Sequence, residues 1–282
     1  MDWSQAQKEM NAALIPLYGE REAAVITDWV MEALSGRKKL DRLSRRTEPL
    51  SPELLARFLR WRDELMAHRP VQYVLRESWF AGMKFYVDDR VLIPRPETEE
   101  LVEWVIAETG PDRPTLLDIG TGSGCIAVAL AKKLPLAEVH ACDVSGDALE
   151  VARRNARQLN AGVSFHQLDF LDEQHWAELP PVSCLVSNPP YVPLQEKGTM
   201  DAHVVHAEPA LALFVPDGDA LVFYRALGTF AWQRLQKGGA LYAEIHEEKG
   251  DAVRELLLQL GASEVVLRKD MQGKDRMIKA IY

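Results

Sequence analysis

Cysteine is scarce in this chain of 282 residues, and long apolar runs are missing. The three cysteines, Cys125, Cys142 and Cys184, form no C-x-x-C pair. This excludes a disulfide scaffold, and we expect free, buried thiols in a reducing compartment. No run reaches the ~18 apolar residues of a membrane-spanning helix, and the N-terminus shows no basic-then-apolar leader. We therefore expect a cytoplasmic protein with no membrane partner and, since no ligand cluster stands out, no metal.

An excess of basic residues is also missing. The chain has 33 Lys and Arg against 42 Asp and Glu, for a net charge of -9. Proteins that coat nucleic acid are usually basic, so no direct nucleic-acid partner is expected. Residues 76–282 are the acidic part, with 21 basic and 31 acidic side chains, whereas residues 1–75 are nearly neutral. Segment 37–46 carries six basic residues. It could contact RNA or an acidic partner, or it could be a solvated connector.

Length and composition are typical of two globular domains, with 47% hydrophobic and 27% charged residues. Residues 25–34 show helical spacing of apolar side chains, and Ser51-Pro52 is a typical helix start. We therefore predict an all-helical domain over residues 1–75. Strand-like residues around Gly82 and further on, at Val87 and 91–93, predict a β-hairpin linker over residues 76–95.

Strand and helix patterns alternate from residue 115 onward, and this predicts an α/β domain over residues 96–282. The predicted strands number seven, at 115–119, 138–143, 163–168, 182–187, 239–245, 263–268 and 277–281. Helical patterns lie between most of them, at about 125–134, 145–159, 219–235 and 248–260. Such alternation is typical of a Rossmann-like, mostly parallel sheet covered by helices on both faces.

A glycine loop follows the first of these strands, with the sequence Gly120-Thr121-Gly122-Ser123-Gly124 and an acid at Asp118. Glycines allow a tight turn and a close approach to a ligand. Asp143 ends the next strand, where a carboxylate can accept from ribose hydroxyls, and Asp169-Phe170 ends the third, where an acid and a ring can hold adenine. A bare turn without ligand and an NAD site are the alternatives, but the NAD fingerprint is G-x-G-x-x-G.

The sequence Asn188-Pro189-Pro190-Tyr191 ends the fourth strand, 182–187. In an open α/β sheet this turn and the glycine loop face the same crevice. The prolines lack N–H donors, so the turn offers two acceptors, the Asn188 side-chain oxygen and the Pro189 carbonyl, which can hold a planar NH₂ group. Tyr191 offers an aromatic surface. The alternative is a rigid turn without ligand. The pattern favours amino-methylation by positioning, because no obvious strong base lies nearby.

These motifs resemble those of class I S-adenosylmethionine-dependent methyltransferases. Within that class, the segment from Ile93-Pro94-Arg95-Pro96 to Glu99, together with Glu208-Pro209 and Asp275-Arg276, resembles the HemK/PrmC family of release factor glutamine methyltransferases. The resemblance covers nearly the whole chain. It implies methylation of the glutamine amide nitrogen in the Gly-Gly-Gln motif of class I peptide-chain release factors, with residues 1–75 recognising that substrate.

The resemblance also implies roles for individual residues. The loop from Gly120 to Gly124 would hold the methionine end of S-adenosylmethionine, Asp143 the ribose and Phe170 the adenine. Asn188, which also borders the cofactor, would hold the substrate glutamine with Pro189, Pro190 and Tyr191.

Two other functions stay open at this stage: a DNA or RNA amino-methyltransferase acting on adenine N6 or guanine N2 with the same turn, and a cofactor-binding protein without catalysis. The preferred release factor, the oligomeric state and the roles of Arg95, Glu97 and His246 are not predicted. We expect His246 to be a residue at the strand end and not a base.

Overall fold

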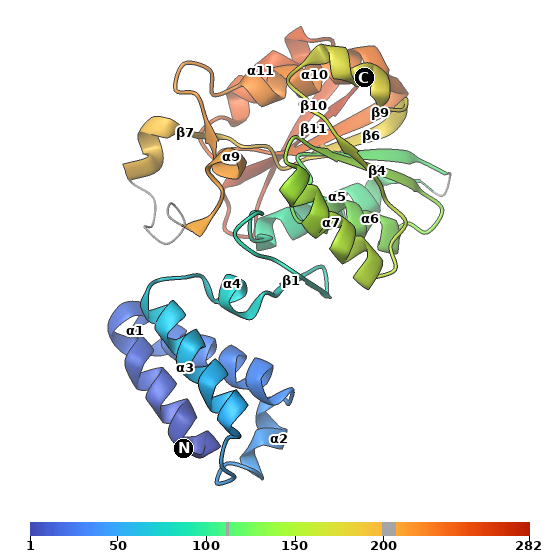
Figure 1. Cartoon of the computed structure of the whole chain (residues 1–282). Helices are drawn as coiled ribbons and strands as arrows, with labels where there is room; N and C mark the ends of the chain where they lie inside the picture. Colours follow the sequence, from blue (N-terminus) through green and yellow to red (C-terminus); the bar gives the residue numbers. More distant parts are fainter. Residues whose placement is uncertain (111–112, 199–206) are drawn as a thin grey trace. The chain divides into compact units, whose positions relative to one another are not determined.

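The computed structural model describes residues 1–110, 113–198 and 207–282, and it separates into two compact units (Figure 1). One unit contains Met1–Glu77. The other contains the described residues of 78–201 together with Glu208–Tyr282. Among the described residues, no helix has both the length and the apolar character needed to cross a membrane.

The first unit is helical, with α1 (Trp3–Ser35), α2 (Lys39–Leu43), α3 (Pro52–Met66) and α4 (Val71–Leu75). The predicted start of α3 is confirmed, because the Ser51 hydroxyl accepts from the Leu54 amide at 3.3 Å. Gly19 adopts a φ of 73° and interrupts the helical geometry of α1. This unit has a core of its own, to which Met10, Val30 and Phe58 contribute completely buried side chains.

The basic segment 37–46 contains the short helix α2. Of its six basic side chains, Arg42 is buried and forms an ion pair with Asp28, and the other five are exposed. Five basic side chains thus lie on the surface of this unit, and Arg42 anchors the segment.

A seven-stranded sheet forms the centre of the second unit, in the order β10-β11-β9-β6-β3-β4-β5. The sheet is mostly parallel, because only β11 runs antiparallel to its neighbours, β9 and β10. The strands are β3 (Thr115–Ile119), β4 (Glu138–Asp143), β5 (Ser164–Gln167), β6 (Val182–Ser187), β9 (Leu235–Glu244), β10 (Glu264–Lys269) and β11 (Asp275–Ile281). The predicted fold class is confirmed, and β3, β4 and β6 match the predicted bounds.

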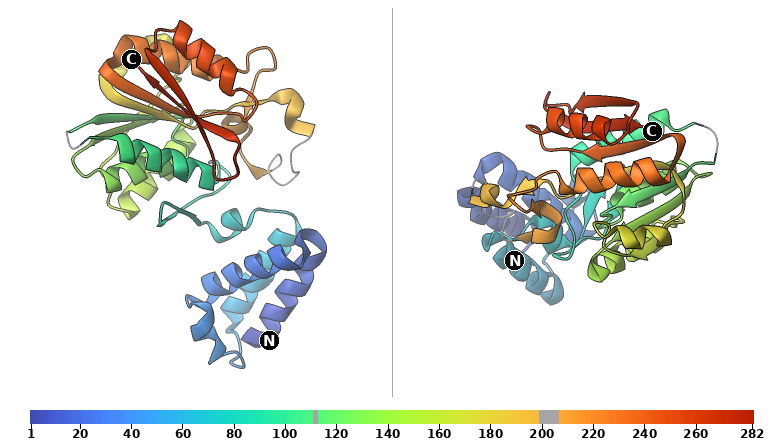
Figure 2. Two further views of the ribbon diagram at one scale, coloured as in Figure 1. Left: turned by 180° about the vertical axis from the view of Figure 1, so that it is seen from behind. Right: turned by 90° about the horizontal axis from the view of Figure 1, so that it is seen from above.

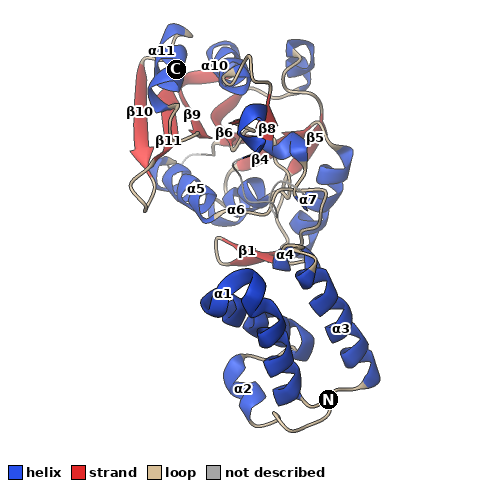
Figure 3. Ribbon diagram, turned by 90° about the vertical axis from the view of Figure 1, so that its left-hand side faces the viewer, coloured by secondary structure: helices blue, strands red, loops and turns tan. Residues whose placement is uncertain are grey.

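Helices cover both faces of the sheet (Figures 2 and 3). On one face lie α5 (Pro96–Glu108), α6 (Cys125–Lys133) and α7 (Gly146–Gln158), and on the other lie α10 (Val222–Arg234) and α11 (Gly250–Gln259). Each face has its own apolar core, and the three cysteines are free and buried within them, as predicted. The remaining short elements are η1 (Glu173–Glu178), β7 (Val192–Pro193), η2 (Leu194–Gly198), α9 (Ala210–Leu213) and β8 (Phe214–Val215).

The hairpin consists of β1 (Ser78–Phe80) and β2 (Met83–Phe85). Its Phe80 and Phe85 side chains are fully buried, with ring centroids 6.0 Å apart, in the core that also contains α5 and α6. The hairpin is thus packed as part of the second unit. The expected strand character at Val87 and 91–93 was wrong, since this segment is a loop.

Asn155 on α7 joins three segments of the second unit. Its side-chain oxygen accepts from the Tyr86 amide at 2.7 Å, and its NH₂ group donates to the carbonyls of Tyr86 and Ser123, both at 2.9 Å. Asn155 is 1% exposed, so water cannot replace these bonds. The residue after the hairpin and the glycine loop are therefore held by one buried amide.

We expect Asn155→Ala to lower the free energy of unfolding by about 2–4 kcal/mol, because it leaves buried backbone groups without partners. Urea denaturation of the full chain measures this. Gln158→Ala, on the same helix but exposed, is the control and should change stability by less than about 0.5 kcal/mol. Equal stabilities of the two variants would contradict the assignment.

Candidate active site

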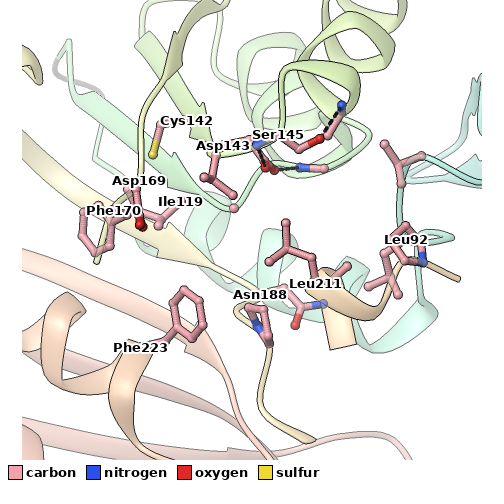
Figure 4. Close-up of a pocket in the computed structure, with 18 of the residues that line it drawn as sticks. Leu92, Ile119, Cys142, Asp143, Ser145, Asp169, Phe170, Asn188, Leu211 and Phe223 are labelled. Atoms are coloured by element: carbon pink, nitrogen blue, oxygen red, sulfur yellow. Dashed lines mark hydrogen bonds between the residues drawn. The ribbon is translucent and has the colours of Figure 1, made fainter. Parts of the chain in front are cut away.

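A cavity of about 250 Å³ opens at the carboxyl ends of β3, β4 and β6. Chain order reverses here, since β4 and β6 lie on opposite sides of β3, and open α/β sheets bind ligands at such points. Gly120, Gly122, Asp143, Phe170 and Asn188 all line this cavity. Figure 4 shows Asp143 and Asn188 from different strand ends facing the same space, with the rings of Phe170 and Phe223 beside them.

The glycine loop needs its glycines for two reasons. Gly120, Gly122 and Gly124 have φ values of 69°, 53° and 80°, in the left-handed region that side chains disfavour. A Cβ on Gly124 would also lie 3.0 Å from the Cβ of Ala152 on α7. Gly120 and Gly122 face the cavity, whereas Thr121, Ser123 and Gly124 are not among its lining residues.

Asp118 stabilises the glycine loop through a buried hydrogen bond. It is almost completely buried, and its Oδ2 accepts from the Thr121 hydroxyl at 2.6 Å. Burial raises the pKa of Asp118 to about 7, although the Thr121 hydrogen bond opposes this. The Thr121 hydroxyl is thus used within the loop, and Thr121 is not among the residues that line the cavity.

Asp143, at the end of β4, is anchored by two backbone amides. Its Oδ2 accepts from Gly122 N at 2.9 Å and its Oδ1 from Ser145 N at 3.0 Å. Burial raises the pKa of Asp143, and these amides oppose that rise. Each carboxylate oxygen retains a second lone pair, so Asp143 can still accept from a vicinal diol such as a ribose.

Phe170 forms the apolar wall of the cavity. It is 5% exposed, and its ring packs against Trp176 and Phe230 with centroid distances of 5.6 and 5.3 Å. The Trp176 indole also donates to the Phe170 carbonyl at 2.9 Å. A flat aromatic group such as adenine would thus meet a rigid ring.

The Asn188–Tyr191 turn presents only part of itself to the cavity. Asn188 and Pro190 line it, whereas Pro189 is buried and Tyr191 lies outside the lining set. The Tyr191 ring instead forms a T-shaped pair with the His246 ring, at a centroid distance of 6.1 Å. His246 follows the end of β9, and its Nε2 lies 3.5 Å from a Glu196 carboxylate oxygen.

A buried network behind the turn was missed by the sequence analysis. The Asn188 NH₂ donates to the Thr98 hydroxyl at 3.0 Å, and Thr98 donates to Glu244 at 2.6 Å. The Tyr191 hydroxyl donates to the other Glu244 oxygen at 2.9 Å. Glu244 is 2% exposed, and burial raises its pKa while Thr98, Tyr191 and Arg276 oppose the rise. A charged residue ending the apolar stretch Ala240–Ala243 was the signal available in the sequence.

Two residues whose roles were not predicted have clear partners. Arg95 forms an ion pair with Glu208 at 2.5 Å, and Glu208 also accepts from the Ile93 amide at 3.3 Å. Leu92 and Pro209, which neighbour these residues in sequence, both line the cavity. The contacts of Glu208 therefore hold two segments of the cavity wall together. Glu97 lies 3.5 Å from the Gln272 side-chain nitrogen.

The groups that line the cavity suit S-adenosylmethionine, the cofactor expected from the sequence. Asp143 provides carboxylate lone pairs, Phe170 an apolar wall, and Gly120 and Gly122 backbone without side chains. Within the described ranges, no three His, Cys, Asp or Glu side chains are grouped as metal ligands.

Family models match both parts of the chain. The model described as methyltransferase small domain matches residues 98–230, and the model described as PrmC N-terminal domain matches residues 5–75.

Curated relatives match nearly the full length. The release factor glutamine methyltransferase of Flavobacterium psychrophilum is 40% identical over 280 residues, covering 96% of this chain and 95% of that protein. The protein of the same name from Bacteroides thetaiotaomicron is 44% identical over 216 residues, covering 77% of each. Among solved structures, the hMettl16 catalytic domain in complex with MAT2A 3′UTR hairpin 6 superimposes with a TM-score of 0.55 at 17% identity, covering 82% of each chain. That last likeness shows a shared fold only.

We expect Asp143→Ala to weaken S-adenosylmethionine binding by roughly 1.5–3 kcal/mol, because charge-assisted hydrogen bonds to the ribose are lost. Titration calorimetry measures the change. Asp147→Ala removes an equal charge from an exposed position on α7 and should bind as the parent chain does. Unchanged affinity in Asp143→Ala would refute the ribose assignment.

Proposed function

The chain belongs to the family of release factor glutamine methyltransferases, and we propose that it methylates the glutamine amide nitrogen in the Gly-Gly-Gln motif of class I peptide-chain release factors. The methyl donor is S-adenosylmethionine. The observation that carries the proposal is the convergence of the glycine loop, Asp143 and Asn188 on one cavity. Release factors act in translation termination, so this activity belongs in the cytoplasm.

Catalysis in this proposal is positioning. S-adenosylmethionine, when bound, supplies a sulfonium methyl group. We assign the Asn188 side-chain oxygen, on the cavity wall, and the backbone carbonyl of the buried Pro189 as acceptors of hydrogen bonds from the two N–H groups of the substrate NH₂. Together they would hold its nitrogen in line with that methyl group. Both acceptors gain strength as positive charge develops on the nitrogen, so they favour the transition state over the ground state. As the bond from nitrogen to the methyl carbon forms, the bond from sulfur to that carbon breaks, and the methylated nitrogen then releases one proton to solvent, because no general base is assigned. Tyr191 lies outside the cavity lining, and its hydroxyl holds Glu244 behind the turn.

Residues 1–75 are proposed to recognise the protein substrate and take no part in the chemistry. They form a unit with its own core, and the assigned cofactor and acceptor residues all lie in the other unit. The five exposed basic side chains of segment 37–46 offer this unit a positively charged surface for an acidic region of the substrate.

A DNA or RNA amino-methyltransferase is the second candidate, because an NH₂ group on a base could be held by the same acceptors. The acidic balance of residues 76–282, with 21 basic against 31 acidic side chains, disfavours phosphate binding near the cleft.

Mass spectrometry distinguishes the two functions. The full chain and S-adenosylmethionine are incubated with purified release factor, with bulk tRNA, with DNA or without acceptor. We expect one added methyl group on the Gly-Gly-Gln peptide and none on nucleic acid. A release factor carrying Gln→Asn in that motif is the matched control. Methylation of nucleic acid alone would overturn the proposal.

We expect Asn188→Ala to lower kcat by about 10²–10³, the scale for losing one transition-state hydrogen bond. Single-turnover measurements at saturating cofactor isolate this step. The thermal midpoint of the variant, compared with the parent chain, checks that the fold is intact. A kcat within threefold of the parent would show that Asn188 does not hold the reacting amide.

A further inference from the structure

We infer that Glu244, acting through Thr98, determines which atom of the Asn188 amide faces the substrate. Thr98 and Glu244 are positioning residues in this inference, which rests on the proposed function for the identity of the substrate. An Asn side chain ends in an acceptor oxygen and a donor NH₂ of nearly equal size. Turning the amide over would replace the acceptor that a substrate NH₂ needs with a second donor, so some contact has to select the orientation.

The contact that selects it is a chain of two hydrogen bonds, supported by a third from Tyr191. It runs from Asn188 at the end of β6 to Thr98 in the first turn of α5, and then to Glu244 at the end of β9. Thr98 and Glu244 are each 2% exposed, so water does not compete for these bonds. The Tyr191 hydroxyl donates to the remaining oxygen of Glu244.

The number of available protons determines which group donates in each of these hydrogen bonds. A hydroxyl has one proton, whereas an ionised carboxylate only accepts. Thr98 and Tyr191 donate to different oxygens of Glu244, so the single Thr98 proton is already used. Thr98 can therefore only accept from Asn188, and Asn188 has to turn its NH₂ toward Thr98. The Asn188 oxygen is left for the cavity, which Asn188 lines (Figure 4).

The charge of Glu244 is what makes the arrangement one-way. Burial raises the pKa of Glu244, and Thr98, Tyr191 and Arg276 oppose that rise; only the ionised form can accept from both hydroxyls at the distances observed. A neutral amide at this position would have one acceptor oxygen for two hydroxyl donors. One hydroxyl would then have to reverse its proton. Arg276, which can only donate, also interacts with the Tyr191 hydroxyl, whereas the partner of Thr98 is an amide that can turn over. Thr98 is therefore the hydroxyl that reverses, and its reversal turns the Asn188 amide over.

The first test compares Thr98→Val with Thr98→Ser in the full chain. Valine keeps the shape of threonine and removes the hydroxyl, so we expect kcat on release factor to fall about 10- to 100-fold, with the Kd for S-adenosylmethionine within twofold. Serine keeps the hydroxyl and should restore kcat to within about threefold. Thr109→Val is the matched control, because its hydroxyl bonds the Val105 carbonyl at the far end of the same helix; it should leave kcat unchanged. A parent-like kcat in Thr98→Val would overturn the inference.

A second variant tests the role of the carboxylate. Glu244→Gln should lower kcat about tenfold or more while keeping cofactor affinity. A loss in Thr98→Val with none in Glu244→Gln would overturn the assignment to Glu244.

Nuclear magnetic resonance of the side-chain amides tests the orientation without using activity. The Asn188 pair is identified by its absence from Asn188→Ala. We expect it to shift and exchange faster with solvent in Thr98→Val, and to stay parent-like in Thr98→Ser and Thr109→Val. An unchanged pair in Thr98→Val would overturn the inference. If the parent chain methylates no release factor, the proposed function fails, and this spectrum still decides the orientation.

Discussion

The pairing of β3 with β6 is the contact on which the site depends. Ile119 and Ser187 lie opposite each other in that pair, and the Ser187 hydroxyl donates to the Ile119 carbonyl at 2.8 Å. Both strands are parallel, so their carboxyl ends meet at one edge of the sheet. The glycine loop and the Asn188 turn each begin one residue beyond this pair. Two motifs that are far apart in the chain are thereby brought to one cavity.

Buried polar groups then give the cavity its chemistry. Asp118 stabilises the loop, and two backbone amides fix the orientation of Asp143. Glu244 accepts hydrogen bonds from two hydroxyls behind the turn. Burial raises the pKa of each of these carboxyls, and hydrogen-bond donors oppose that rise. Groups held in this way are already oriented before substrate arrives, so little reorganisation is needed during methyl transfer.

The proposed function divides the work between the two units. The helical unit buries its own core and presents basic side chains around α2, whereas the residues that we assign to the cofactor and the acceptor lie in the second unit. Reaction chemistry and recognition of a large substrate can thus vary separately. The hairpin follows the helical unit in sequence, yet Phe80 and Phe85 pack in the catalytic core.

Local sequence was sufficient for the two motifs and for the strands of the main sheet, but not for the loop at Val87 and 91–93. Strand bounds such as 115–119 and 182–187 follow from apolar runs closed by turn residues, and the glycine loop follows from the need for positive φ. Which atoms meet was decided only by the tertiary structure. Thr121 faces Asp118 and not the cavity, and Tyr191 bonds Glu244. Thr98 and Glu244 are separated by 146 positions. Periodicity indicates which side chains are buried, but strand order and the packing of α5 determine which buried groups become neighbours.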